Sequence, residues 1–445
     1  MKKNTLFFLI TFGFLLRLCM AIPGMNSPEK TFFRPDSLSY INSAKAIWKT
    51  GHFYQSPESK TPATFRSPGY PVILAALFAL SQSSLKIPVI FFCLLSALTA
   101  VFVHGTCKNL GAGNRACFAA ILFFIGHLTS IAIAPLYLAD TALTFWIAAQ
   151  LFFFTRYLRS KNKFDLLGSF FFNALAVLTK PIAFGSLLGC LFWLAFISPD
   201  PLRQRLQSLA QCLCVSLILC VPWMFRNQVA GAGFRLETNA ANFYLHYRAN
   251  LQSVLTGIPV QTWRDQWMRE TNNEFQKYPE QYATEDAKYR YQKEKLKALI
   301  AEHPFTFLRL QLQPCVLLPD AATFFELLGI TKTGRGTLDI LNHQGFIAAV
   351  HHYFDGKIYL LWMISPLLLL ALFMTLGCFF QVGFWFFEKK TTELFLFVSF
   401  VLFYLLLPGP IIAPRYHLPA LPLMTVMAGL CLERIGGAEK GRGRK

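Results

Sequence analysis

Long apolar stretches recur along most of this chain, and short polar segments that collect lysine and arginine separate them. A helix needs roughly 17–25 mainly apolar residues to cross a bilayer core of about 30 Å. On this basis the pattern predicts ten membrane-spanning helices. They are expected near Thr5–Ala21, Lys86–Thr106, Ala116–Leu136, Thr141–Leu158, Leu166–Thr179, Ile182–Ile197, Leu206–Phe225, Ile358–Val382, Leu394–Leu407 and Leu418–Leu432.

Two longer polar stretches interrupt these spans. Lysine and arginine in short loops are retained on the cytoplasmic side, which puts both long stretches outside and both termini inside. The apolar segments Tyr70–Leu80 and Phe305–Ile330 are interfacial helices, re-entrant pieces or two further spans, so we expect about 10–13 transmembrane helices. The expected organisation is a first transmembrane helix at 1–24, a first external loop at 25–85, a transmembrane bundle at 86–225, a large helical external loop at 226–357, C-terminal transmembrane helices at 358–433 and a basic cytoplasmic tail at 434–445.

The composition supports an all-α polytopic membrane protein. The chain is 54% hydrophobic with 46 Phe and only 15% charged, which is too apolar for an ordinary soluble domain. The net charge of +19 does not indicate nucleic acid, because much of it lies in the tail and in the loops that set topology. Cys315 stands alone in the second external loop, so that loop cannot contain an internal disulfide.

Asp36 is the strongest candidate for chemistry. It precedes a predicted helix in the first external loop, and Gly51 is placed to end that helix. A carboxylate at a membrane surface can take the proton of an acceptor hydroxyl. If the sugar donor is a lipid phosphate, the leaving group is already an anion and cations suffice to stabilise it. The alternative is that Asp36 or Ser37 only caps the helix.

Four cations lie at or near the predicted outer ends of spans: Arg66, Lys180, Arg226 and Arg415. Each is a candidate ligand of the donor phosphate, because arginine pairs bidentately with phosphate oxygens. Alternatively, each of these side chains only extends its charged end to the membrane surface and binds no ligand. Asp140, at the external start of a span, is either a second catalytic carboxylate or a helix cap. Arg17, within the first span, is a cation that lines a cavity or one that reaches the surface.

The sequence supports no cofactor firmly. His343, His351, His352 and Asp355 could ligate a divalent cation, but their spacing matches no specific template. A divalent cation therefore stays an alternative, and no metal site is assigned. Nucleotide-binding fingerprints are absent from the sequence, so a nucleotide-sugar donor is not supported.

An ordered set of motifs resembles the polytopic glycosyltransferases that use polyprenyl-phosphate sugars, including protein O-mannosyltransferases and the aminoarabinose transferases of lipid A. The motifs are Asp36-Ser-Leu-Ser-Tyr40, Arg66-Ser-Pro-Gly-Tyr-Pro71, Leu138-Ala-Asp-Thr141, Leu178-Thr-Lys-Pro181, Pro222-Trp-Met-Phe-Arg-Asn227 and Pro414-Arg-Tyr-His-Leu-Pro419.

The resemblance implies a helical bundle of the C type, with the active site under the first external loop. It makes Asp36 the catalytic base and Arg66, Lys180, Arg226 and Arg415 the candidate ligands of the donor phosphate. Tyr40, Tyr70 and Tyr416 lie in the same motifs and are the candidate substrate-binding residues. Many relatives have an Asp-Glu pair where this chain has Asp36-Ser37, and the aminoarabinose enzymes have an acid where Phe65 stands, which weakens any metal site built on those acids.

We therefore expect an inverting glycosyltransferase of a bacterial inner membrane, with its site facing the periplasm. Its expected partners are a polyprenyl-phosphate sugar, membrane lipid and a hydroxyl acceptor on a lipid, glycan or protein. Two alternatives remain: a transporter or flippase of lipid-linked sugars, and a non-catalytic scaffold subunit. A transporter is expected to show inverted repeats and interrupted helices near the midplane, and the sequence shows neither.

Overall fold

The computed structural model describes residues 1–312, 320–331, 337–411 and 413–442, and these residues form helices joined by loops. Strand pairing within them is limited to an isolated bridge between Tyr54 and Pro62 in the first external loop. The predicted all-α class is confirmed. Cys315 and the side chain of His343 lie outside what the structure describes.

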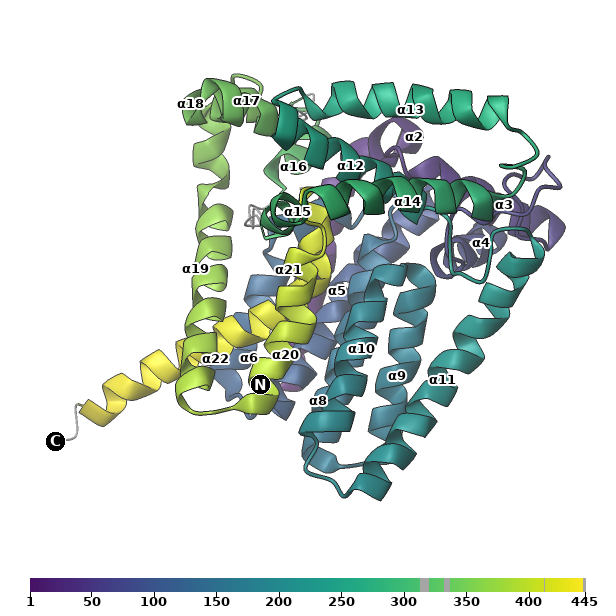
Figure 1. Cartoon of the computed structure of the whole chain (residues 1–445). Helices are drawn as coiled ribbons and strands as arrows, with labels where there is room; N and C mark the ends of the chain where they lie inside the picture. Colours follow the sequence, from purple (N-terminus) through teal and green to yellow (C-terminus); the bar gives the residue numbers. More distant parts are fainter. Residues whose placement is uncertain (313–319, 332–336, 412, 443–445) are drawn as a thin grey trace.

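A bundle of steep helices forms the larger layer of the molecule (Figure 1). Five described helices are long and apolar enough to cross a membrane, and shorter apolar helices pack between them. The bundle consists of α1 (Lys3–Ala21), α5 (Lys86–Asn109), α6 (Asn114–Ile125), α7 (Leu128–Ile133), α8 (Asp140–Ser160), α9 (Lys163–Thr179), α10 (Phe184–Phe192), α11 (Leu202–Val229), α19 (Tyr359–Phe387), α20 (Thr391–Phe397), α21 (Phe403–Leu406) and α22 (Leu421–Arg442).

The remaining helices form a cover over one end of the bundle, where α13 lies across the others (Figure 1). His303 separates α14 from α15, which begins at Pro304, as expected from that proline. The cover consists of α2 (Pro28–Phe32), α3 (Ser37–Thr50), α4 (Gly69–Ser81), α12 (Ala240–Thr256), α13 (Val260–Lys277), α14 (Glu285–Glu302), α15 (Pro304–Gln311), α16 (Ala321–Leu327), α17 (Thr337–Gln344) and α18 (Phe346–Tyr353).

The predicted span Ala116–Leu136 is not one helix. It is divided into α6 and α7 at Gly126 and His127. Arg17 lies against this break and is fully buried. Its guanidinium donates to the Ile125 carbonyl oxygen at 3.3 Å and to Ser130 Oγ at 2.6 Å, one group on each side of the break. Arg17 therefore neither lines an open cavity nor reaches the membrane surface, but donates to a carbonyl oxygen at the end of α6 and to a side-chain hydroxyl in α7.

The segment Tyr70–Leu80 forms α4, whose 13 residues span only about 20 Å at 1.5 Å per residue. It is too short to cross a bilayer alone, and it packs against α3 and α5. The first external loop is thus a compact unit on the end of the bundle. Within it, α3 ends as predicted at Gly51, which has the left-handed φ of 73° that favours glycine.

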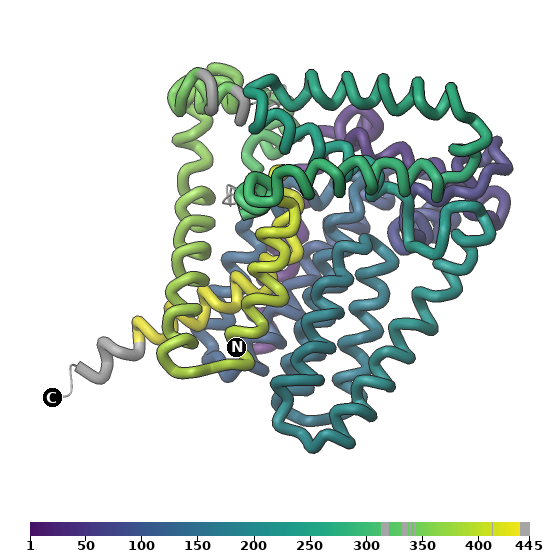
Figure 2. Tube along the Cα trace, in the orientation of Figure 1, coloured from purple at the N-terminus to yellow at the C-terminus, as the bar shows by residue number. Residues whose placement is uncertain are grey.

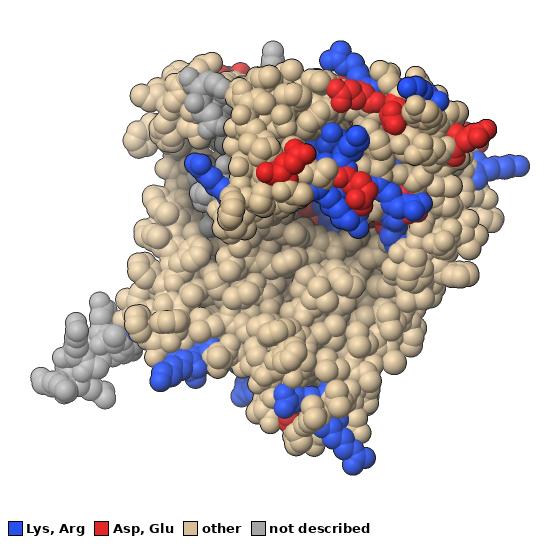
Figure 3. All heavy atoms as spheres, in the orientation of Figure 1, with Lys and Arg blue, Asp and Glu red and all other residues tan. Residues whose placement is uncertain are grey.

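Charged side chains occupy two zones separated by a wide uncharged band (Figure 3). One zone lies on the surface of the helical cover, and the other lies at the opposite end of the bundle. The tube view shows that the N-terminus and the short α8–α9 loop lie toward that opposite end, away from α13 (Figure 2). This distribution is the one expected of a multi-pass membrane protein, because isolated charges are costly in the bilayer core.

Candidate active site

Asp36 immediately precedes α3, where a capping role was one alternative. Its carboxylate makes no capping hydrogen bond to that helix. Instead Oδ1 accepts a hydrogen bond from Arg66 Nη2 at 2.7 Å, and Oδ2 accepts one from Arg415 Nη2 at 2.7 Å. Each carboxylate oxygen therefore carries its own guanidinium. The structure brings together three residues that the sequence analysis had selected separately.

Arg66 is held in place by α3. Its Nε donates to Ser39 Oγ at 2.8 Å, and its guanidinium carbon lies 4.5 Å from the centre of the Tyr40 ring. Nη1 also donates to the Tyr40 hydroxyl at 3.4 Å. The side chain is almost completely buried, and its Nη2 end lies against Asp36. Tyr40 packs edge-to-face on Tyr70, with ring centres 5.0 Å apart.

Arg415 enters the site from the other end of the sequence. It lies in a short 3-10 helix, Pro414–Ala420, that leads into α22. Its Nη2 donates to the hydroxyl of Tyr416 at 3.3 Å as well as to Asp36. The chain folds back on itself here, because 379 residues separate Arg415 from Asp36.

Asp140 and Lys180 form a second ion pair. Asp140 is the first residue of α8, Lys180 follows the end of α9, and Lys180 Nζ lies 2.8 Å from Asp140 Oδ1. Both side chains are largely buried. Lys180 Nζ also lies 5.7 Å from the centre of the Tyr416 ring, so this aromatic ring lies between the second pair and Arg415.

Arg226 is not part of this cluster in the structure. Its guanidinium donates to the backbone carbonyl oxygens of Phe53 at 2.7 Å and Ala63 at 2.6 Å. It also lies over the Trp223 ring. These contacts tie the end of α11 to the first external loop, and they are the contacts of a residue that positions a loop.

The electrostatics of Asp36 follow from this geometry. Burial raises the pKa of its carboxyl, but the nearby Arg415 and Arg66 guanidinium groups outweigh burial and lower it to about 2. Asp36 is consequently ionised at all physiological pH values. While both arginines remain in contact with it, the carboxylate is a weak base.

Glu237 is a third carboxylate near this cluster, and the sequence analysis did not select it. It lies between α11 and α12 and accepts hydrogen bonds from Ser67, the residue after Arg66. No motif or spacing pattern surrounds Glu237, so nothing in the local sequence distinguishes it from other acids in the long external loop.

Asp36 and Asp140 are each paired with cationic side chains. Both oxygens of Asp36 face arginines and one oxygen of Asp140 faces Lys180, so these carboxylates are already neutralised by cations. Among the described residues no group of three His, Cys, Asp or Glu side chains has metal-binding geometry. His352 Nδ1 lies 2.9 Å from Thr337 Oγ1 in the separate α17–α18 region.

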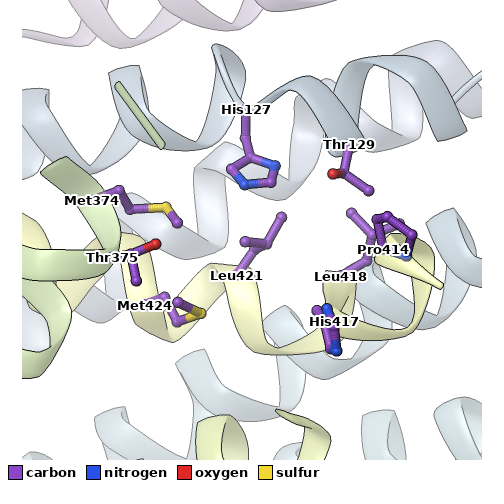
Figure 4. Close-up of a pocket in the computed structure, with 9 residues that line it drawn as sticks. All are labelled: His127, Thr129, Met374, Thr375, Pro414, His417, Leu418, Leu421 and Met424. Carbon is purple, nitrogen blue, oxygen red and sulfur yellow. The ribbon is translucent and has the colours of Figure 1, made fainter. Parts of the chain in front are cut away.

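A small pocket lies between α7, α19 and the start of α22, and Pro414, the residue before Arg415, is one of the residues that line it (Figure 4). Met374, Leu421 and Met424 supply apolar walls, and the His127 ring points into the space between α7 and the start of α22. His127 is buried, and its Nδ1 has no hydrogen-bond partner among the described residues. The pocket is therefore mainly apolar with a few polar groups. Its lining residues are His127, Thr129, Met374, Thr375, Pro414, His417, Leu418, Leu421 and Met424.

This chain is similar to known membrane glycosyltransferases in part of its sequence and in its fold. Residues 65–225, a little more than a third of the chain, match the family described as dolichyl-phosphate-mannose-protein mannosyltransferase. The structure is similar to that of the archaeal oligosaccharyltransferase AglB from Archaeoglobus fulgidus in complex with an inhibitory peptide and a dolichol-phosphate. That superposition has a TM-score of 0.55 at 13% identity and covers 97% of this chain and 50% of the other.

This chain has the C-type glycosyltransferase fold. A second structure of the Archaeoglobus fulgidus oligosaccharyltransferase, tethered to an acceptor peptide, gives a TM-score of 0.53 at 13% identity and covers 98% of this chain and 50% of the other. ArnT from Cupriavidus metallidurans bound to undecaprenyl phosphate gives a TM-score of 0.46 at 15% identity, covering 94% and 60%. No curated protein sequence matches the chain significantly.

The resemblance inferred from the motifs is confirmed as a resemblance: residues 65–225 match the family model, and the fold is of the C type. The chain spans about half the length of the archaeal enzymes that it superposes on. At this low identity the superposition establishes the fold, whereas substrates and partners have to be argued from the site.

Proposed function

We propose that this C-type chain is an inverting glycosyltransferase that moves one sugar from a polyprenyl-phosphate donor to a hydroxyl group. The acceptor hydroxyl belongs to an envelope lipid, glycan or protein. The observation that carries the proposal is the placement of Asp36 between Arg66 and Arg415. A potential base and two cations that can hold an anionic leaving group meet at one point.

The contacts of Asp36 with Arg66 and Arg415 explain how binding of the donor makes Asp36 more basic. The donor phosphate competes with Asp36 for the two guanidinium groups, because both anions need the same donors. When Arg66 and Arg415 turn toward the phosphate, the Asp36 carboxylate loses its counter-charges and becomes more basic. The base is therefore released only in the presence of the donor.

The chemical step then balances without a cofactor. Asp36 takes the proton of the acceptor hydroxyl, and the acceptor oxygen attacks the anomeric carbon from the face opposite the phosphate. The bond between that carbon and the phosphate oxygen breaks, and its electron pair leaves with the lipid phosphate. Arg66, Arg415 and Lys180 stabilise the negative charge of the leaving group. Asp140 keeps Lys180 in place through their 2.8 Å ion pair.

The lipid part of the donor needs an apolar path next to the phosphate. The pocket between α7, α19 and α22 has apolar walls, and Pro414, the neighbour of Arg415, contributes to its lining (Figure 4). In this conformation the pocket has room for little more than a water molecule, so the polyprenyl chain is not placed in it. Tyr416 contacts both Arg415 and Lys180 and is proposed to contact the substrates. Tyr40 and Tyr70 are almost completely buried and are proposed to support Arg66 from behind.

The proposed setting is a bacterial inner membrane with the site on the periplasmic side. Support comes from the basic short loops at the end of the bundle away from the cover, because such loops are retained in the cytoplasm. The helical cover and the arginine cluster lie at the other end, where a lipid-linked donor and an envelope acceptor can meet.

The direct test replaces Asp36 with Asn and measures sugar transfer from a radiolabelled polyprenyl-phosphate donor in detergent. Asp36→Asn is expected to lose at least about 100-fold in kcat, because general base catalysis contributes about 10²–10⁴-fold. Asp265→Asn, on the exposed face of α13, is the matched control. Full turnover by Asp36→Asn would show that Asp36 is not the base, and absence of turnover in the wild type would favour a scaffold role. Donor binding without cleavage by the wild-type chain would indicate a transporter.

A further inference from the structure

Glu237 joins the second external loop to the turn that carries Arg66. Its Oε2 accepts two hydrogen bonds from Ser67, one from the backbone nitrogen at 3.1 Å and one from Oγ at 3.0 Å. Ser67 is completely buried, and Arg66 nearly so. A carboxylate that binds both the amide and the hydroxyl of one residue restricts the backbone at that residue.

The backbone on both sides of Glu237 is fixed as well. Thr238 N donates to the Thr64 carbonyl oxygen at 2.9 Å, and Asn227 Nδ2 donates to the Leu236 carbonyl oxygen at 3.0 Å. Arg226 holds the first loop from the same side through Ala63. Glu237 is therefore supported from α11 and from the first external loop, so its hold on Ser67 does not depend on a single contact.

Glu237 also contributes charge to the site. Burial raises the pKa of its carboxyl, and the charges of Arg66 and Lys180 act in the opposite direction. Both cations are thus close enough to sense it, yet neither forms an ion pair with it among the described residues. Asp36 can lose Arg66 to an incoming phosphate, whereas the contact between Glu237 and Ser67 leaves the guanidinium untouched.

We propose that Glu237 is a positioning residue of the donor site, which keeps Arg66 aimed at the donor phosphate by holding Ser67. The proposal rests on the phosphate-binding role given to Arg66 in the proposed function. It assigns a part in donor binding to the second external loop, whose described residues take no part in the ion pairs of Asp36 and Asp140. Arg66 needs such support because it leaves its partner Asp36 when the donor phosphate binds. At that stage Asp36 no longer holds the guanidinium in place.

The experiment measures two quantities in purified full-length protein. The first is the dissociation constant for farnesyl phosphate, a short prenyl phosphate that carries no sugar. The second is the change in KM for the donor, compared with the change in kcat. The variants are Glu237→Ala, Glu237→Gln and Ser67→Ala. Glu285→Ala, an exposed acid at the start of α14, is the control.

Glu237→Ala is expected to weaken farnesyl phosphate binding and to raise the donor KM by about tenfold, with kcat changed less than about threefold, because it removes two hydrogen bonds to a charged acceptor. Ser67→Ala keeps the amide contact and is expected to lose about threefold. Glu237→Gln keeps an acceptor oxygen and should recover most of the binding. The Glu237→Ala and Ser67→Ala effects should not add, since both remove one shared contact.

Unchanged farnesyl phosphate binding in folded Glu237→Ala would overturn the proposal. If Glu237→Ala does not fold, unchanged binding in Ser67→Ala would overturn it in the same way. A loss in kcat with KM and binding unchanged would also contradict it. Because farnesyl phosphate binding needs no turnover, absence of sugar transfer in the wild-type chain would reject the proposed enzyme while leaving this measurement decisive for Glu237.

Discussion

At the scale of single residues, Asp36 is the group on which both the chemistry and the local charge balance depend. Its two oxygens each contact one arginine at 2.7 Å. The side chain keeps about a third of its surface exposed, with a relative accessibility of 33%. A ligand can therefore approach the carboxylate without opening the fold, which a deeply buried ion pair would not permit.

The ion pairs of Asp36 with the two arginines should make the folding stability of the protein depend on pH. The pKa of Asp36 is lowered to about 2, so its stabilising contribution is complete above the unfolded value of about 3.9 and is lost as the pH falls toward 2. We expect the difference in melting temperature between the wild type and Asp36→Asn to be constant from pH 7 to 5. It should then shrink below about pH 4. A difference that grows on acidification would contradict the assigned ion pairs.

Asp36→Asn should also bind a lipid phosphate more tightly than the wild type. Removing the carboxylate leaves Arg66 and Arg415 without the anion that competes with the phosphate, which should increase affinity by about three- to tenfold. Farnesyl phosphate binding to the detergent-solubilised variant measures this. Weaker binding by Asp36→Asn would show that the carboxylate supports the phosphate instead of competing with it.

At the scale of helices, the Asp140–Lys180 pair connects the start of α8 to the end of α9. Asp140 Oδ2 is buried and has no hydrogen-bond partner among the described residues, so its charge depends on Lys180. Removing one partner of such a pair leaves an uncompensated charge in a poorly solvated place. The two helices should therefore tolerate loss of both charges better than loss of one.

A double-mutant cycle tests this coupling. Lys180→Met should lower the free energy of unfolding by about 3–5 kcal/mol, the usual effect of breaking a buried pair. Lys180→Met combined with Asp140→Asn should lower it by less. Unfolding by SDS in mixed micelles provides the measurement. Additive losses would show that the two side chains do not interact in the membrane.

Motifs identified some of the helix-end residues but not their partners. Arg66 and Arg415 are found from sequence because charged residues near predicted span ends are conspicuous in an apolar chain, and Asp36 is found as the acid before a predicted helix in the first external loop. Arg226 carries the same signal, yet the structure turns it toward the Phe53 and Ala63 carbonyl oxygens. Position at a span end does not reveal which way a long side chain turns, because that depends on the neighbouring loop.

At the scale of the whole molecule, the separation of charge into two zones predicts the topology (Figure 3). Ser59 lies in the first external loop, and Lys389 lies in the short α19–α20 loop at the other end. In a Cys315→Ser background, Ser59→Cys should react with a membrane-impermeant maleimide in spheroplasts. Lys389→Cys should react only after the membrane is permeabilised. The reverse pattern would place the arginine cluster on the cytoplasmic side.

Hydropathy by itself determined that this chain is a helical membrane protein, and it placed the five described helices that are long and apolar enough to cross a membrane. It could do so because the transfer of a segment into lipid depends on that segment's own length and composition. The break between α6 and α7 was missed, since Arg17, from another helix, donates hydrogen bonds on both sides of it.

Only the tertiary structure decided which charges meet. Asp36 could have capped α3, and instead it faces Arg66 and Arg415, which lie 30 and 379 residues away along the chain. Glu237 and Ser67 are 170 residues apart, and no local pattern connects them. The physical reason is that a buried charge is stabilised by whatever partner the fold brings within a few ångströms, and that distance is not encoded in the neighbouring sequence.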